Sequence, residues 1–217
     1  MKKFTRRAAL LGAGGAAGWT LSRAFGPNLP VYEGTRRIAS GAGETTLNDA
    51  SGLSPTPIHK HMIVKQDPDD ALIAIVRQEL AAARKDGRPL NVGAARHSMG
   101  GQAIPRNGTA ITFDNGSVEL DSASRSYRAH AGARWSQVMS ARDPAGFSPA
   151  VMQSNHDFGG AATFSVNAHG WPVPYGPMGS TVRSLRMVMP DGELVTCSPS
   201  ENTDLFNLAM GGYGLIG

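Results

Sequence analysis

The chain has 217 residues, of which 41% are hydrophobic and 18% are charged; this is the composition of a folded globular protein and excludes a disordered chain. The formal net charge of +4 does not indicate nucleic-acid binding, because five of the 21 basic residues lie within residues 1–25, which hold no acidic residue, and the other 16 are balanced by 17 acidic residues. Cys197 is the only cysteine, which excludes an intramolecular disulfide and a thiolate metal cluster.

Residues 1–25 have the layout of an export signal. A basic stretch that contains the pair Arg6-Arg7 precedes a weakly apolar, glycine-rich run, and Ser22-Arg23-Ala24 offers small residues for a signal peptidase. We therefore expect a twin-arginine signal peptide and a periplasmic or extracellular protein, with a single uncleaved anchor as the alternative. The apolar run is too short for stable membrane insertion. Residues 26–55, rich in Gly, Ser, Thr and Pro, predict an extended lead-in.

A strand–helix–strand unit is predicted to follow from residue 56. Residues 62–65 form a short apolar run typical of a strand. Asp67-Pro68 predicts a helix start, because Asp caps helices and Pro fits their first turn. Apolar residues then recur at helical spacing up to Gly87, which predicts the helix end. Residues 89–93 predict a second strand, parallel to the first.

Shorter strands separated by turn residues come next. They are predicted at residues 108–113, 127–132, 185–189 and 193–197. The turn Pro190-Asp191-Gly192 predicts that the last two strands form a hairpin.

The end of the chain predicts one more helix. Ser198 and Glu201 have the spacing of a capping box, so a helix is expected from Ser198 to about Met210, ending at Gly211-Gly212. The predicted fold is α+β with two subdomains. A small βαβ unit occupies residues 56–117, and a larger mixed or antiparallel sheet flanked by helices occupies residues 118–217.

The loop after the second predicted strand is rich in small residues. It reads Gly93-Ala94-Ala95-Arg96-His97-Ser98-Met99-Gly100-Gly101-Gln102. Small residues allow backbone N–H groups to converge on an anion, and the Ser98 hydroxyl and Gln102 amide add donors. Such a loop is by itself a weak indication of phosphate binding, so the order of side chains around His97 decides its interpretation.

Arg96-His97-Ser98 and Gly101-Gln102-Ala103 resemble the FAD-binding domain of the vanillyl-alcohol-oxidase or PCMH type of FAD-linked oxidoreductase. Members of this family carry His-Ser and then Gly-Gln after a strand, and in several of them the His is bonded covalently to the 8α-methyl carbon of the flavin. The resemblance implies an FAD cofactor attached at His97. The alternative is that His97 only hydrogen-bonds within the loop, while FAD is bound noncovalently or not at all.

Two later segments extend the resemblance. Residues 158–170 resemble the second FAD-contacting segment, except that Ala161-Ala162 stands where the family has two glycines, which would strain any position that needs positive φ. Residues 182–217 resemble the segment that ends in a Gly-Gly-x-Gly turn beside the flavin. The cofactor-binding residues that the resemblance implies are Gly93, Ala94, Ala95, Arg96, His97, Ser98, Gly101, Gln102, Asp157, Gly159, Gly160, Thr163, Ser165, Asn167, His169, Gly170, Gly214 and Ile216.

The sequence identifies no catalytic base. Cytokinin dehydrogenases carry an Asp seven residues before their Gly-Gly pair, whereas this chain has Ser154 there or, counted from its own glycines, Met152, which disfavours cytokinin oxidation. His59 and His61 could form half of a metal site, but no carboxylate cluster accompanies them and we expect no metal. Because the substrate domain of the family follows the Gly-Gly-x-Gly turn, we expect this sequence to be a C-terminally truncated fragment of a longer reading frame.

The resemblance implies an FAD-dependent oxidase or dehydrogenase that oxidises an alcohol, polyol, sugar or lactone-type substrate and passes electrons to oxygen or another acceptor. The alternative is an exported flavin-binding module without turnover. His130 is expected to be a surface or core residue. Trp135 and Trp171 are expected to be packing residues, with stacking on the flavin as the alternative.

Overall fold

The computed structural model describes residues 46–65, 70–171 and 174–217. The predicted signal peptide, the lead-in up to residue 45 and the predicted helix start at Asp67-Pro68 lie outside these ranges. Of the helices within them, none combines the length and the apolar character needed to cross a membrane.

The fold includes part of the predicted lead-in. Strand β1 (Thr46–Leu47) pairs antiparallel with β2 (Thr56–Pro57). Leu47 is 2% exposed and packs with Ile58, Ile104 and Ala110. The lead-in predicted for residues 26–55 is therefore too long at its C-terminal end, because a buried apolar side chain joins residues 46–55 to the core.

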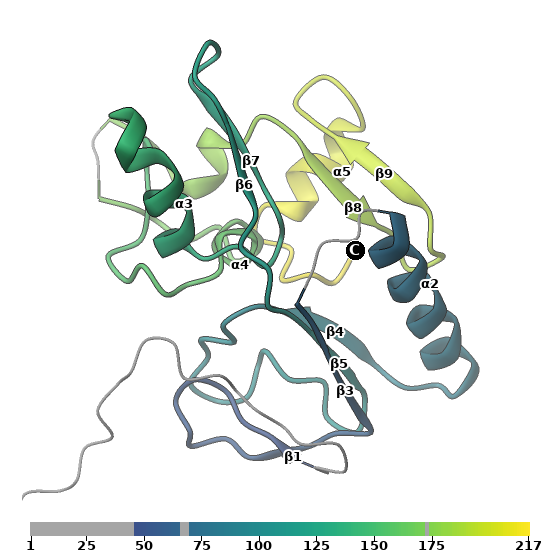
Figure 1. The fold of residues 1–217 in the computed structure, drawn as a ribbon. Coiled ribbons are helices and arrows are strands. Elements are labelled where there is room, and N and C mark those ends of the chain that lie inside the picture. The colour runs from purple at the N-terminus through teal and green to yellow at the C-terminus, as the bar shows by residue number, and fades with distance from the viewer. Residues whose placement is uncertain (1–45, 66–69, 172–173) are drawn as a thin grey trace, which may run out of the picture. The chain divides into compact units, whose positions relative to one another are not determined.

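A three-stranded parallel sheet forms the first part of the fold (Figure 1). Its strands are β3 (Lys60–Val64), β5 (Thr109–Phe113) and β4 (Leu90–Gly93), in that order. All residues of the central strand β5 are buried. Helix α2 (Asp70–Lys85) connects β3 to β4, and its residue Leu72 packs on the β5 side chains. The parallel strand–helix–strand prediction is confirmed, with β5 inserted between the two predicted strands.

The chain then forms a hairpin covered by a helix. Strands β6 (Val118–Asp121) and β7 (Ser126–Ala129) are antiparallel, and α3 (Trp135–Arg142) packs against β6, followed by the 3-10 turn η1 (Asp143–Ala145). β6 was not predicted from the sequence, and β7 ends at Ala129 and not at residue 132 as predicted.

The two tryptophans have different environments. Trp135 is 1% exposed in an apolar cluster with Val138, Val151 and Met178, so its predicted packing role is confirmed. Trp171 is 74% exposed, so the same prediction for Trp171 is wrong. A tryptophan predicts burial only where other apolar groups surround it.

A second hairpin carries the last helix. Strands β8 (Leu185–Val188) and β9 (Leu194–Cys197) are antiparallel and joined by the predicted turn, in which Gly192 has φ 91°. Helix α5 (Thr203–Ala209) begins at Thr203 and not at Ser198. The Ser198 hydroxyl accepts the Glu201 N–H at 3.0 Å, and the two backbones pair at 2.8 Å, so this segment closes a turn before the helix.

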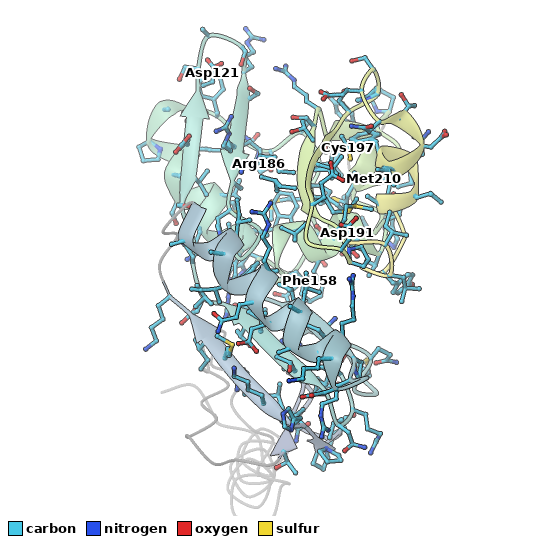
Figure 2. All side chains as sticks on the ribbon, turned by 90° about the vertical axis from the view of Figure 1, so that its right-hand side faces the viewer. Asp121, Phe158, Arg186, Asp191, Cys197 and Met210 are labelled. Atoms are coloured by element: carbon cyan, nitrogen blue, oxygen red, sulfur yellow. The ribbon has the colours of Figure 1, made fainter. Side chains whose placement is uncertain are left out.

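The strands after residue 117 form two separate two-stranded sheets instead of the expected larger sheet. Each hairpin is covered by different helices, since α3 contacts β6 whereas α2 contacts β8 and α5 contacts β9. Cys197 and Met210 pack in the apolar cluster between β9 and α5 (Figure 2). Two short helical segments, α4 (Gly160–Ser165) and η2 (Met178–Thr181), lie between the hairpins in sequence. The described residues therefore have an α+β fold.

Candidate functional site

The loop of residues 93–102, called the His97 loop below, leaves the carboxyl end of β4, where open parallel sheets commonly bind ligands. Its Arg96 has φ 49°, a left-handed conformation that costs a non-glycine residue energy. The Arg96 side chain is buried and donates hydrogen bonds to the Asn91 side chain (2.9 Å), the Ile111 carbonyl (2.9 Å) and the Ala103 carbonyl. These bonds hold the loop in place from inside.

The Arg96 guanidinium therefore points into the protein. A Cβ on Gly93 would lie 2.8 Å from Arg96 Cζ, so Gly93 leaves room for that guanidinium. Burial lowers the pKa of Arg96 to about 10, which still leaves it charged at neutral pH. Gly93 and Arg96 are both predicted cofactor residues. In this structure Arg96 makes hydrogen bonds within the protein, and Gly93 leaves room for its guanidinium.

Asp49 supports the loop from the other side. Its carboxylate accepts hydrogen bonds from the Ser98 hydroxyl at 2.7 Å and the Gly101 N–H at 2.9 Å. Burial raises the pKa of Asp49, but hydrogen bonds from Ser51, Ser98 and Gly101 outweigh it and lower the pKa below 3.8. Asp49 could not be predicted from the sequence, because its partners Ser98 and Gly101 lie 49 and 52 residues further along the chain.

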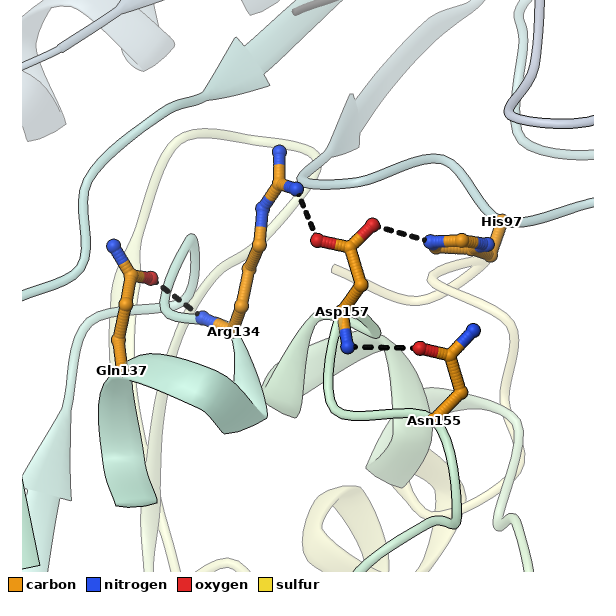
Figure 3. A network of polar contacts seen from close by, with 5 residues as sticks. All are labelled: His97, Arg134, Gln137, Asn155 and Asp157. Atoms are coloured by element: carbon orange, nitrogen blue, oxygen red, sulfur yellow. Dashed lines mark hydrogen bonds and ion pairs between the residues drawn. The ribbon is translucent and has the colours of Figure 1, made fainter. Parts of the chain in front are cut away.

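A polar network joins the loop to the segment before α4 (Figure 3). His97 Nε2 lies 2.9 Å from Asp157 Oδ2, and the Arg134 guanidinium lies 2.5 Å from Asp157 Oδ1. Asp157 is 7% exposed, so its carboxylate is held between the imidazole and the guanidinium away from bulk water. The His97 ring also packs edge-on against Phe158, with ring centroids 4.7 Å apart. Asp157, a predicted cofactor residue, therefore contacts His97 directly.

Two side chains hold the backbone of the network residues Asp157 and Arg134. The Asn155 side chain accepts the Asp157 N–H at 2.9 Å, and the Gln137 side chain accepts the Arg134 N–H at 2.8 Å (Figure 3). The backbones of Asp157 and Arg134 are thus each held by a side-chain acceptor.

The second predicted segment lies against the loop. A Cβ on Gly159 would lie 3.0 Å from the Ala94 Cβ, so the two segments approach closely at this glycine. The Gly160 N–H donates to the Ala133 carbonyl at 2.8 Å as α4 begins. Ala161 and Ala162 are inside α4 and have no positive φ, so the missing family glycines cause no strain there.

The third predicted segment lies against the end of α4. The Gly211 N–H donates to the Phe164 carbonyl at 3.2 Å, and the Tyr213 N–H donates to the Ser165 carbonyl at 3.0 Å. Gly211 and Gly214 have φ of 92° and 68°, which requires glycine-like freedom in this turn. The three predicted segments therefore form one continuous series of contacts.

Several other predicted residues bond within their own segments. Gln102 Oε1 accepts the Gly100 N–H at 2.9 Å, and the Thr163 hydroxyl donates to the Gly160 carbonyl at 2.6 Å. A Cβ on Gly170 would lie 2.1 Å from a Val151 methyl, so Gly170 is required by packing.

The remaining predicted residues are placed as follows. Ala95 is buried, and Asn167 has φ 47° beside Gly211. The His169 carbonyl accepts the Gln153 amide. Ile216 packs with the β9–α5 cluster, so its side chain is directed into that cluster.

Two histidines outside the loop, His61 and His130, have hydrogen-bond partners. His61 lies 2.9 Å from the Thr112 hydroxyl, and His130 accepts the Gly132 N–H at 3.0 Å. Across residues 46–65, 70–171 and 174–217, no three His, Cys, Asp or Glu side chains cluster as metal ligands would. A cleft between α2 and the β8–β9 turn, where Asp191 is labelled in Figure 2, contains none of the predicted site residues.

The sequence of the chain is similar to a protein family and to several known proteins. Residues 71–198 match the model of the family described as "FAD binding domain". Cytokinin dehydrogenase 8 of Oryza sativa subsp. indica is 30% identical over an alignment that covers 70% of this chain and 31% of that protein. Cytokinin dehydrogenase 4 of Oryza sativa subsp. japonica is 30% identical over 66% of this chain and 29% of that protein.

A fungal protein matches a shorter stretch. "Putative D-arabinono-1,4-lactone oxidase" of Neurospora crassa is 29% identical over 40% of this chain and 16% of that protein. The chain therefore spans less than a third of the length of each of these three relatives.

Proposed function

The chain belongs to the FAD binding domain family, and from that premise we propose that it is the flavin-binding part of an exported FAD-dependent oxidoreductase whose flavin is bonded to His97. The observation that supports this proposal is the contact of the three motif segments. The ring contact of His97 with Phe158 and the close approach of Ala94 to Gly159 join the first two, and the bonds from Gly211 and Tyr213 to the end of α4 join the last two. One elongated dinucleotide needs all three side by side.

The residues present suit this cofactor. Small residues at Ala94 and Gly159 bring two backbone segments together without intervening side chains, which suits the close approach of a diphosphate. The side chain of His97 is 17% exposed, so it can be reached from outside while Asp157 orients it. In the proposed two-subdomain arrangement of the PCMH type, the parallel sheet supplies the loop and residues 118–217 supply the other two segments.

The role of His97 is to supply one imidazole nitrogen as a nucleophile. Because the Asp157 carboxylate can only accept, the proton of the neutral ring would lie on Nε2, and the other nitrogen would present its lone pair. If that nitrogen were bonded to the flavin 8α-methyl carbon, one proton would leave the methyl carbon, one proton would leave the imidazole and two electrons would be released, and dioxygen would take up both protons and both electrons as hydrogen peroxide. Asp157, itself paired with Arg134, would hold Nε2 and so orient the ring.

The substrate is proposed to be an alcohol, polyol, sugar or lactone-type compound, oxidised by hydride transfer to FAD, with oxygen or another compound as final acceptor. Cytokinin oxidation is disfavoured, although the rice relatives are cytokinin dehydrogenases, because Ser154 and Met152 offer no base. Asp157 is engaged by His97 and Arg134.

The test is the colour of denatured protein. The protein, expressed from its complete reading frame, is purified and precipitated with acid, and flavin absorbance is measured in the pellet and in the supernatant. Flavin in the wild-type pellet supports covalent attachment, and His97→Ala should move it to the supernatant. His156→Ala is the matched control, because His156 is an exposed histidine close in sequence to Asp157.

Other results contradict the proposal in separable ways. Flavin only in the wild-type supernatant contradicts the covalent bond, and no flavin in either fraction contradicts flavin binding. Anaerobic bleaching of the bound flavin by candidate sugars and alcohols identifies an enzyme, whereas no bleaching by any of them favours a binding module without turnover. The export route is tested separately, by expressing the protein in cells with an intact twin-arginine pathway. The leader should be cleaved in the wild type, and cleavage should stop when Arg6→Lys and Arg7→Lys are combined.

A further inference from the structure

The segment after β1 is fastened to both residues that flank His97. Asp49 is 3% exposed, and its Oδ2 accepts a hydrogen bond from the Ser98 hydroxyl at 2.7 Å. The next residue, Ala50, donates its N–H to the Arg96 carbonyl at 3.0 Å. Arg96 and Ser98 are therefore both tied to the same short segment, and the position of His97 between them depends on it.

The Asp49 carboxylate satisfies four neutral donors. Oδ2 also accepts the Gly101 N–H at 2.9 Å, and Oδ1 accepts the Ser51 N–H at 3.1 Å and the Ser51 hydroxyl at 2.5 Å. A carboxylate can accept on both oxygens at once, whereas an amide presents one acceptor and one donor. Hydrogen bonds to an ionised group are also the stronger kind. The site is therefore built for an anion.

The Asp49 carboxylate accepts hydrogen bonds from Ser98 and Gly101, two residues that the family resemblance assigns to the cofactor. The Ser98 hydroxyl and the Gly101 N–H each have a single hydrogen, and both hydrogens point to Asp49 Oδ2. Neither group can make a full-strength hydrogen bond to a diphosphate while Asp49 keeps it. The loop thus contains its own negative charge next to the residue proposed to carry the flavin.

We propose that Asp49 is a positioning residue for flavin attachment: as a built-in anion it takes the donors of Ser98 and Gly101 and fixes the loop in the form that presents His97. This inference rests on the proposed function. It assigns Ser98 and Gly101 to shaping the loop and not to contacting the diphosphate. The left-handed backbone of Arg96, φ 49°, needs such a support, because an unsupported loop would relax from it.

The decisive experiment measures covalent flavin per folded molecule in Asp49→Asn. The amide must direct its NH₂ group toward either the Ser98 and Gly101 donors or the Ser51 donors, so one pair loses its acceptor. Asp121→Asn is the matched control, because exposed Asp121 (Figure 2) likewise accepts from backbone N–H groups and a serine hydroxyl, all within three residues of it. Ser98→Ala removes one donor and keeps the carboxylate.

All variants are made in the full-length protein, and the folded monomer is isolated by gel filtration before acid precipitation. We expect the flavin retained in the pellet per folded molecule to fall at least fivefold in Asp49→Asn and about twofold in Ser98→Ala, with no change in Asp121→Asn. The rate at which folded apo-protein binds added FAD covalently should fall by the same factors. A merely structural role would lower the yield and the melting temperature but leave both ratios unchanged.

Each outcome has one meaning. Unchanged ratios in Asp49→Asn, with a yellow wild-type pellet, overturn the inference and leave the proposed function standing. A colourless wild-type pellet overturns the covalent proposal and this inference together. If Asp49→Asn yields no folded monomer, Ser98→Ala decides: a twofold loss supports the inference, and full retention overturns it.

Discussion

The His97 loop and the glycine turn at residues 211–214 adjoin the same segment around α4, but they are held in different ways. In the loop, the buried charges of Arg96 and Asp49 hold the backbone through side-chain hydrogen bonds. At the glycine turn, backbone N–H groups bond directly to backbone carbonyls. The loop should therefore be sensitive to the loss of a particular side chain, whereas the turn should be sensitive to the addition of any side chain.

The largest effect is expected from Arg96→Met, which breaks the loop side of this comparison. The Ile111 and Ala103 carbonyls lose a charged donor in the interior, so the free energy of unfolding should fall by about 3 kcal/mol. Urea denaturation measures this change. Arg106→Met, at an exposed position of the same region, is the control, and equal losses in the two variants would contradict the role given to Arg96.

Gly212→Ala breaks the turn side and should cost about 2 kcal/mol. Its Cβ would lie 2.2 Å from the Leu208 carbonyl oxygen, so the backbone must move. Thermal unfolding followed by circular dichroism measures the loss. In the control Gly176→Ala the new Cβ would lie 3.6 Å from the Ser180 Cβ, which is an ordinary contact. If Gly212→Ala and this control had the same melting temperature, the tight packing of the turn would be refuted.

Arg134→Gln tests the contact between the loop and the segment before α4. Asp157 would keep its bond to His97 but lose its cation, and because the Arg134 side chain is 22% exposed the expected loss is about 1 to 2 kcal/mol. Urea denaturation and covalent flavin content are measured together. Arg128→Gln, at an exposed position of β7, should change neither quantity. A stable Arg134→Gln protein with full covalent flavin would show that the ion pair is dispensable.

The smallest effect is the pH dependence of Asp49. Because its pKa is lowered below 3.8, its carboxylate contributes stability that is fully present above the unfolded-state pKa and is lost as the pH falls through the folded-state value. The difference in unfolding free energy between wild type and Asp49→Asn should thus be constant from pH 7 to about 5 and shrink below pH 4. Urea titrations at several pH values test this prediction. A difference in unfolding free energy that grows as the pH falls would contradict it.

Much of the fold could be predicted from short-range patterns. The β8–β9 hairpin formed at Pro190-Asp191-Gly192 because turn chemistry is local, and for the same reason α2 ends at Lys85, two residues before Gly87 with its φ of 63°. The predicted helix start at Ser198 was wrong because the same hydroxyl can close a turn as well as cap a helix. Burial was also mispredicted for Trp171, since exposure depends on which groups surround a side chain.

The sequence by itself determined the order of the three cofactor motifs, the parallel unit that precedes them and the residue, His97, on which the proposal centres. Only the tertiary structure decided that Asp157 bonds His97, that Asp49 holds Ser98 and that Arg96 points inward. The physical reason is distance along the chain. Helical periodicity and turns depend on neighbours a few residues away, whereas these hydrogen bonds join residues 60, 49 and 15 positions apart and exist only once the elements have packed.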